Sequence, residues 1–311
     1  ISRVLNQKED VAAETQDRIL DVIQQLGYTS NLAARSMRSR KLNMLGLIVP
    51  DMEGPYSFEI IKGVNRAIAN RSYDLLVYTT GDFKKHDTPA HEQHYVSLLN
   101  GTITDGVLVV TPSFSEFSTT SPLVSIDPNI VNPNYPTFLA TNYVGAVDAV
   151  QYLIDLNHRQ IAYITGRPGI QNTDRLNAYM DCLDKNHIPF DANLVVEGDF
   201  STRGGYLAAG DLLTRTNRPT AIFASNDQTA FGVMHRAKEL GLRIPQDLSV
   251  VGFDNISESE YLDLTTIDQS LMNMGTMAAE MLIDLINHKE VENKVITIPT
   301  RMVVRGSCQA L

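Results

Sequence analysis

An alternation of apolar strands and amphipathic helices, beginning at Met44, constrains the fold more than any other feature of the sequence. The run "MLGLIVP" is apolar throughout, as is typical of a parallel strand that is buried on both faces. It is followed by "SFEIIKGVNRAIAN", in which Ile61, Val64 and Ile68 share one helical face. Because the alternation runs through two successive series, it predicts an α/β protein with two doubly wound parallel-sheet lobes.

The strands and helices of the two series occupy successive stretches of the chain. In the first, we expect strands at 44–50, 73–80, 105–111 and 122–126, and helices at 92–100 and 144–156. In the second, we expect strands at 160–166, 193–198, 219–225 and 248–254, and helices at 175–185, 205–214 and 229–240. A last helix, from Met274 to Ile286, carries a methionine-rich stripe with helical spacing, which indicates core packing rather than a binding surface.

Composition narrows the class of protein. The 311 residues are enough for two domains, and 43% hydrophobic with 20% charged residues is typical of a folded globular protein. No apolar run approaches the roughly 20 residues that a membrane-spanning helix needs, and the start "ISRVLNQKED" has no apolar signal core. The two cysteines form no CxxC pair, as is typical of a cytoplasmic protein. The net charge of −10 predicts that any contact with nucleic acid is confined to a local basic patch.

Such a patch lies near the start of the chain. A helix is expected at 14–28, with an apolar face made by Ile19, Val22, Ile23 and Leu26. No acidic residue occurs between Val22 and Pro50, whereas basic residues gather at 35–41. A basic linker is one interpretation. The apolar Met37 among the arginines favours another, because minor-groove binders combine phosphate-neutralising arginines with an apolar wedge.

Motifs for catalysis and metal binding are weak. The sequence contains no GxSxG, P-loop or GxGxxG motif. Three histidines, His86, His91 and His94, gather in "HDTPAHEQHY", but the spacing in "HEQH" is one residue short of a zinc-protease helix. A solvated helix start is favoured over a metal site there. We therefore expect no catalytic residues, no metal and no cofactor.

Polar residues follow several of the expected strands. Ligands of doubly wound sheets bind outside the carboxyl ends of the strands, so two facing lobes would form a shared cleft. The residues expected there are Asp51, Asp127, Asn226, Asp227 and Asp254.

Several stretches together resemble the LacI/GalR (lactose-repressor) family of bacterial transcription regulators. They are "ISRVLN", "ILDVIQQLGYTSNLAARSMRSRKLNMLGLIVPD", "NHRQIAYITGRPG", "RPTAIFASNDQTAFGVMHRAKELGLRIPQDLSVVGFDN", "LTTIDQ" and "RMVVRGS". The resemblance implies a partial helix-turn-helix headpiece and hinge helix at 1–43, then a periplasmic-binding-protein-like core at 44–311. The first lobe would span about 44–141 and 271–301, and the second about 142–270 and 302–311. It also implies a homodimer on a two-fold operator and a small-molecule effector between the lobes.

The resemblance assigns DNA contacts position by position. Ser2, Arg3 and Asn6 match the end of the recognition helix. Asn31, Ala34 and Met37 match the minor-groove side of the hinge helix, with Met37 as the wedge. The first helix and the front of the recognition helix are absent from this sequence, so weak operator binding is expected of the chain as it stands.

The resemblance also assigns the effector site. Arg175 matches a ligand-gripping arginine, and its planar fork suits hydroxyls or a carboxylate. The other implied effector residues are Tyr56, Ser57, Asp127, Phe200, Asn226, Asp254 and Gln269. The alternatives are an Arg175–Asp254 ion pair and a core position for Phe200. The family usually shows Asn and two Phe where this chain has Gly54, Tyr56 and Ser57, which leaves the effector open. The chain also lacks the usual proline before "LTT".

The sequence thus predicts a cytoplasmic transcriptional repressor that is controlled by a carbohydrate-like effector and has no catalytic activity. One rival is a solute-binding protein of a sugar transporter, whose core would look the same. The basic segment near the start and the lack of a signal sequence oppose it. The other rival is an α/β enzyme using the cleft carboxylates, for which no nucleophile–base pair is present.

Overall fold

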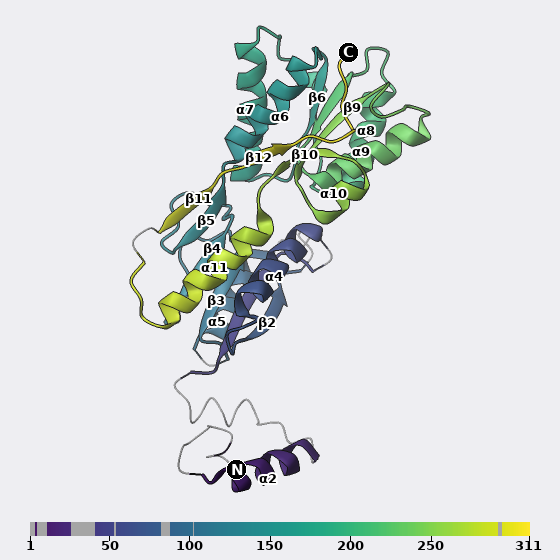
Figure 1. Cartoon of the computed structure of the whole chain (residues 1–311). Coiled ribbons are helices and arrows are strands. Elements are labelled where there is room, and N and C mark those ends of the chain that lie inside the picture. The colour runs from purple at the N-terminus through teal and green to yellow at the C-terminus, as the bar shows by residue number, and fades with distance from the viewer. Residues whose placement is uncertain are drawn as a thin grey trace. The chain divides into compact units, whose positions relative to one another are not determined.

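The structure is a computed structural model that describes residue 4 and residues 11–25, 41–52, 54–81, 88–101, 103–291 and 294–311. The chain divides into two compact units, residues 1–42 and residues 43–311 (Figure 1). Among the described helices, none is both long enough and apolar enough to cross a membrane. Ser2, Arg3, Asn6, Asn31, Ala34 and Met37, for which DNA contacts are predicted, lie outside the described residues.

The described part of the first unit contains one long helix, α2, at Ala13–Gln25. It overlaps the helix predicted at 14–28, whose last residues are outside the described part. Ile19 and Ile23 are half-buried, but Val22 is 45% exposed. Ile19 and Ile23 are four residues apart and lie one above the other on the helix, whereas Val22 is displaced around the helix axis from this pair. The buried stripe is therefore narrower than predicted.

The first sheet of the second unit has six strands in the order β11-β5-β4-β3-β1-β2, all parallel. Helices α4 (Pro55–Ile68) and α11 (Leu271–Ile286) share a core with one face, and α5 (Thr88–Leu99) packs on the other. The strands are β1 Met44–Val49, β2 Asp74–Thr79, β3 Gly106–Val110, β4 Leu123–Ile126, β5 Thr137–Ala140 and β11 Val295–Ile298. With helices on both faces, this lobe is doubly wound, as predicted.

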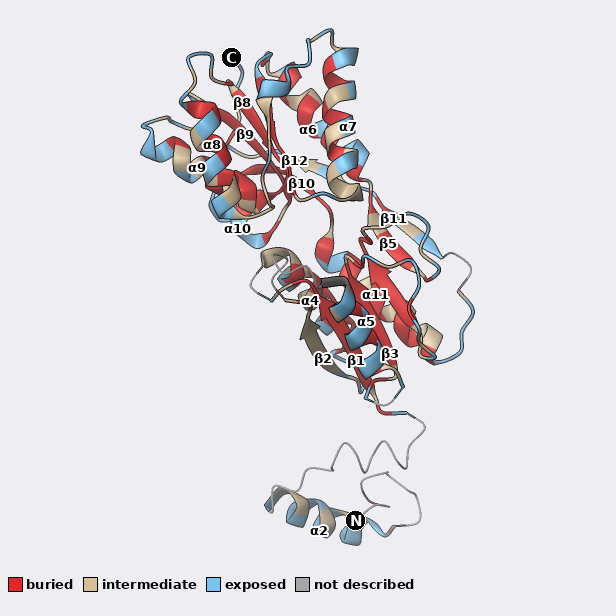
Figure 2. Cartoon of the chain, turned by 180° about the vertical axis from the view of Figure 1, so that it is seen from behind, coloured by how far each residue is buried: buried red, intermediate tan, exposed pale blue. Residues whose placement is uncertain are grey.

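The second sheet also has six strands, in the order β12-β10-β9-β8-β6-β7. Helices α6 (Asn142–Asp155) and α7 (Ile170–Lys185) cover one face, while α8 (Thr202–Leu213) and α9 (Asp227–Glu239) cover the other. The strands are β6 Ile161–Ile164, β7 Val195–Val196, β8 Ala221–Ala224, β9 Ser249–Asp254, β10 Thr265–Asp268 and β12 Arg301–Val303; η1 (Ala192–Leu194) and α10 (Ser257–Tyr261) are short. The second doubly wound lobe is confirmed, and in both lobes the central strands are buried beneath helices with exposed outer faces (Figure 2).

Four strands were not predicted from the sequence: β5, β10, β11 and β12. Each has only three or four residues and includes a threonine or an arginine, so none stands out as a continuous apolar run. Strand β12 is also antiparallel to β10, so the second sheet is parallel except at this edge. Mixed sheets of this kind are common when an edge strand is added to a parallel sheet.

Three connections cross from one sheet to the other. They are the links from β5 to α6, from β10 to α11 and from β11 to β12. Two of them are bonded together, since the Thr141 and Thr300 hydroxyl oxygens lie 2.8 Å apart and the Thr300 N–H donates to the Thr141 hydroxyl at 2.9 Å. The residues that begin or end these links therefore lie at the junction of the lobes.

Helices α4 and α11 cross at very short range. A Cβ atom placed on Gly63 would lie 2.0 Å from the Met272 carbonyl oxygen, and one on Gly275 would lie 2.3 Å from the Ile60 carbonyl oxygen. The predicted methionine stripe of α11 is confirmed as core, because Met274 is fully buried and Met277 packs against the same cluster.

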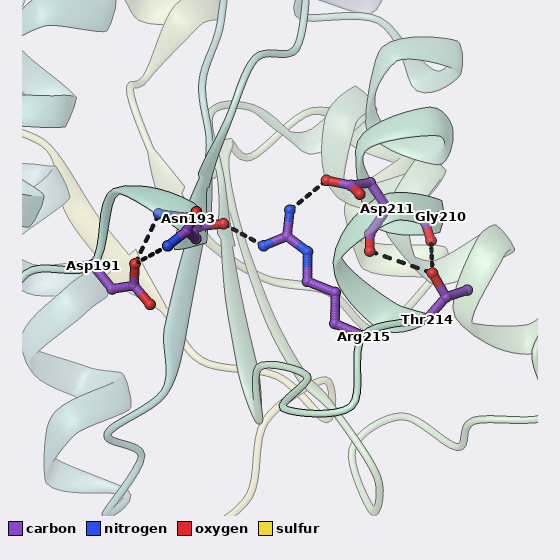
Figure 3. A network of polar contacts seen from close by, with 6 residues as sticks. All are labelled: Asp191, Asn193, Gly210, Asp211, Thr214 and Arg215. Carbon is purple, nitrogen blue, oxygen red and sulfur yellow. Dashed lines mark hydrogen bonds and ion pairs between the residues drawn. The ribbon is translucent and has the colours of Figure 1, made fainter.

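A polar network holds the outer end of the second lobe (Figure 3). Arg215, after α8, donates to the Asp211 carboxylate and to the Asn193 carbonyl, and the Asp191 carboxylate accepts from the Asn193 N–H at 2.9 Å. This network leads into the amino end of β8, the edge opposite the carboxyl ends of the strands. It fixes η1 and the end of α8, and it is remote from the predicted site.

Candidate functional site

Two buried aspartates mark the carboxyl ends of one strand in each lobe. Asp127 directly follows β4, and Asp254 is the last residue of β9. Their exposures are 4% and 5%. Both have positive φ, 51° and 119°, which non-glycine residues seldom adopt and which concentrates at functional sites. Burial is the largest cause that raises the pKa of Asp254, and the negative charges of Asp227 and Asp127 raise it further.

Tyr56 fixes the first of these carboxylates. It lies in the first turn of α4, and its hydroxyl donates to Oδ2 of Asp127 at 3.0 Å. Burial, followed by the charge of Asp127, raises the pKa of Tyr56 well above its ordinary value, so the phenol stays protonated. Burial also raises the pKa of Asp127, and the charge of Arg175 opposes this rise.

Arg175 supplies the positive charge. It projects from α7 with 3% exposure, and its Nε and Nη2 donate to Oδ1 of Asn142 at 3.0 and 2.7 Å. Nη1 donates to the Ser225 carbonyl, and the guanidinium carbon lies 3.7 Å from the centre of the Phe253 ring. Arg175 is therefore held by neutral groups, and the predicted alternative of an ion pair with Asp254 is not observed.

Gln269 completes the group from the second crossing, between β10 and α11. Its Nε2 donates to Oδ1 of Asp254 at 2.5 Å, and its side chain is fully buried. Burial raises the pKa of Asp254 well above its ordinary value, and the charge of Arg175 lowers it. We call these five residues the interlobe cluster: Tyr56, Asp127, Arg175, Asp254 and Gln269.

The other predicted effector residues have mainly local roles. Asn226 caps α9, accepting from the Thr229 N–H at 2.9 Å, and its Nδ2 donates to the Phe200 carbonyl at 3.0 Å. The Phe200 ring lies directly over Gly166. Ser57 is buried in α4, and among the described residues it makes no hydrogen bond to the interlobe cluster. Their contacts with an effector stay predictions.

Two of the five polar residues expected at the strand ends also support the backbone. Oδ1 of Asp51 accepts from the Gly54 N–H at 2.5 Å and closes the turn before α4. Asp227 is fully buried, and its carboxylate accepts from the Ile256 N–H at 3.0 Å and the Ser259 hydroxyl at 2.6 Å. Asp227 thus fixes the segment that follows Asp254.

Sequence reasoning missed Asn142. Its single carboxamide oxygen accepts two N–H groups of Arg175. It is the first residue of α6, directly after the crossing from β5. Because β5 was not predicted, the rule about carboxyl ends of strands was not applied there, although that rule would have found it.

Two further hydrogen-bonded contacts join the lobes. At the first, Nε2 of Gln171 in α7 donates to the carbonyls of Asp127 and Pro128 at 2.8 and 3.0 Å. Beside it, the Ile170 N–H donates to Oδ1 of Asn129 at 3.0 Å. The amino end of α7 in the second lobe is thereby bonded to the loop that carries Asp127 in the first.

The second contact joins α4 to α10. The Ser257 hydroxyl donates to Oε1 of Glu59 at 2.6 Å and accepts from Nζ of Lys62 at 3.1 Å. Glu59 and Lys62 also form an ion pair at 2.7 Å. We refer to these two contacts as the interlobe ties.

The remaining candidates do not form a second site. Of the three histidines, His86 lies outside the described residues, and His91 contacts the Thr80 carbonyl oxygen at 3.1 Å. No group of three metal-ligating side chains occurs among the described residues. Cavities of about 430 and 830 Å³ lie on the first lobe, beside α4 and α11 and beside the amino ends of β4 and β5, so neither contains the interlobe cluster.

Comparisons with known proteins agree with this architecture. Residues 1–31 match the lacI family of bacterial regulatory proteins, and residues 150–308 match the periplasmic binding protein-like domain. The HTH-type transcriptional repressor PurR of Edwardsiella ictaluri (strain 93-146) is 32% identical over 319 residues, which cover 99% of this chain and 92% of that protein.

Solved structures show the same fold. The complex of the transcriptional regulator CelR with cellobiose is 26% identical and has a TM-score of 0.75, covering 98% of this chain and 94% of that one. The lac repressor dimer bound to operator and an anti-inducer is 24% identical with a TM-score of 0.84, covering 99% and 94%. The lacI family match and the PurR relative confirm the regulator interpretation over the solute-receptor one. This protein belongs to the lacI family of DNA-binding transcriptional regulators.

Proposed function

We propose that the affinity of this repressor for operator DNA is controlled by a small carbohydrate-like effector bound at the interlobe cluster. The observation that carries the proposal is that buried polar groups of both lobes gather at their junction, where Gln171 of the second lobe donates to the Asp127 carbonyl of the first. A ligand that bonds to both lobes binds one arrangement of the lobes more tightly than others, and only such differential affinity shifts an equilibrium. The CelR complex with cellobiose supports a carbohydrate as the class of ligand.

The proposal includes the DNA side of the molecule. Residues 1–43 form the headpiece and hinge, and residues 44–311 form the core, with lobes at about 44–141 plus 271–301 and 142–270 plus 302–311. Ser2, Arg3 and Asn6 contact bases, and Asn31, Ala34 and Met37 contact the minor groove. The protein works in the cytoplasm as a homodimer on a two-fold operator, which the lac repressor dimer supports. It has no catalytic activity, in line with its repressor relatives.

A coupled binding experiment tests the proposal. A thermal-shift screen of sugars identifies ligands of the protein, because binding to the folded state raises its apparent stability. Duplexes selected from a random two-fold DNA library then serve in anisotropy titrations with and without each sugar found. We expect a stabilising sugar to change DNA affinity by about 5- to 150-fold. A sugar that binds strongly while DNA affinity stays constant would contradict the proposal, because the core would then bind sugar without controlling DNA binding.

A further inference from the structure

Two buried acceptor atoms of the interlobe cluster lack a donor. No hydrogen bond from the described residues reaches Oδ1 of Asp127 or Oε1 of Gln269. Both side chains are held by their other atoms, Asp127 by the Tyr56 hydroxyl and Gln269 by its bond to Asp254. The Gln171 and Asn142 amides near Asp127 also lower its pKa, but neither makes a hydrogen bond to Oδ1. Leaving a buried acceptor unpaired is unfavourable, so each atom favours a ligand that donates a hydrogen bond to it.

Among the described residues, the interlobe cluster contains one cationic side chain. Arg175 is the only arginine or lysine among the buried described residues, whereas Asp127, Asp227 and Asp254 are buried carboxyls of the same region. Arg175 also heads the charges that lower the pKa of both Asp127 and Asp254. The charge of this one cation already acts on both Asp127 and Asp254, so a ligand with another negative charge would increase the excess of buried acidic groups over buried cations, which is costly.

Two aromatic rings near the cluster are each covered on one face by another group of the protein. The Phe253 ring is covered by the Arg175 guanidinium, and the Phe200 ring lies against Gly166. With one face of each of these two rings occupied, recognition through hydrogen bonds to several hydroxyl groups is favoured over stacking on a flat ring.

Building on the proposed function, we propose that the effector is an uncharged sugar or polyol, and that sugar acids and sugar phosphates are rejected. One ligand hydroxyl donates to Oδ1 of Asp127 and another to Oε1 of Gln269. The N–H groups of Arg175 not used by Asn142 and Ser225 donate to a ligand oxygen, since a guanidinium carries five N–H groups. The two orphaned acceptors thereby gain donors, and no further charge is buried.

Calorimetry with matched pairs of ligands tests this directly. Each pair shares one ring and differs by one acidic group: glucose with glucuronate, galactose with galacturonate, and ribose with ribose 5-phosphate. Cellobiose and the flat base adenine complete the panel. We expect the neutral member of any pair that binds to do so more tightly by roughly tenfold or more. Equal or tighter binding of the acidic member overturns the inference, as does adenine binding more tightly than every sugar.

A variant ties this preference to the cluster. Asp127→Asn keeps the shape and the bond from Tyr56, but it removes one negative charge and turns an N–H₂ group towards the ligand. We expect the ratio of neutral to acidic affinity to fall by roughly tenfold or more. The control Asp191→Asn, on the exposed turn of Figure 3, should leave the ratio at the parent value. An unchanged ratio in Asp127→Asn overturns the inference.

Failure of the inference and failure of the proposed function give different results. If acidic sugars bind best and alter DNA affinity, the protein is still an effector-controlled repressor, and only the class of effector is wrong. If no sugar of any pair stabilises the protein, the proposed effector class fails and the inference fails with it.

Discussion

Replacing Arg175 with alanine is expected to lower the free energy of unfolding by about 3–5 kcal/mol, because removing one member of a buried charged set leaves the others uncompensated. The Asn142 carboxamide oxygen and the Ser225 carbonyl would lose their donors. Asp127 and Asp254 would lose the charge that most lowers their pKa. Effector binding should be lost together with this stability.

The pH dependence of the stability deficit of Arg175→Ala shows whether the deficit is electrostatic. Without Arg175, the pKa values of both aspartates rise further, so the folded variant takes up protons that the unfolded chain does not hold. Its stability deficit should then be smaller at pH 5 than at pH 8. Urea unfolding followed by circular dichroism at both pH values measures the deficit.

Two controls separate charge from packing. Arg175→Met keeps an apolar stem over Phe253, so a deficit close to that of alanine assigns the loss to charge and hydrogen bonds. Lys185→Ala, on the exposed end of α7, should stay within about 0.5 kcal/mol of the parent. A deficit for Arg175→Ala that does not change with pH would contradict the electrostatic account.

The second large effect concerns Glu92, a carboxyl in α5 that is 4% exposed. It accepts from the Ser113 N–H at 2.9 Å and from the Ser113 hydroxyl at 3.3 Å. Burial nevertheless raises its pKa from 4.5 to about 7. Between these values the folded protein holds a proton that the unfolded chain has released. The resulting stability is complete at low pH and is lost as the pH rises through 7.

We expect the free energy of unfolding to fall by roughly 2–3 kcal/mol between pH 5 and pH 8 on account of this one group. Glu92→Gln keeps an acceptor for Ser113 but does not titrate, so its stability should lack this part of the fall. Subtracting the two urea-unfolding profiles removes the contributions of other groups, such as Asp227, which both proteins share. Parallel profiles for parent and variant would show that Glu92 does not titrate in this range.

The long apolar strands were predictable because their patterns are continuous. The prediction at 44–50 matches β1 at Met44–Val49, since six consecutive apolar residues have no stable place except between two layers of helices. Strand β10, at Thr265–Asp268, was not predicted. Its threonines are polar in a hydropathy pattern but pack as β-branched residues in a buried strand.

The candidate site was predictable to the extent that topology determines it. Asp127 and Asp254 follow from the rule that ligands bind beyond the carboxyl ends of parallel strands. Arg175 lies within a helix, where no spacing distinguishes it, and only the resemblance to a family identified it. The same rule selected Asn226, but its amide mainly caps α9, because a residue at a strand end is also the start of the next helix.

The interlobe ties have a consequence for the rate of effector binding. Four of the five cluster residues are buried, and Gln171 and Ser257 tie together the lobes that carry them, so we expect a ligand to reach the cluster only after these bonds part. Each such bond contributes only about 0.5–1.5 kcal/mol, so opening is frequent but precedes every productive encounter. In stopped-flow experiments, the observed association rate should therefore level off with increasing sugar concentration at the rate of lobe opening. Ser257→Ala should raise that plateau while leaving every group that contacts the sugar in place.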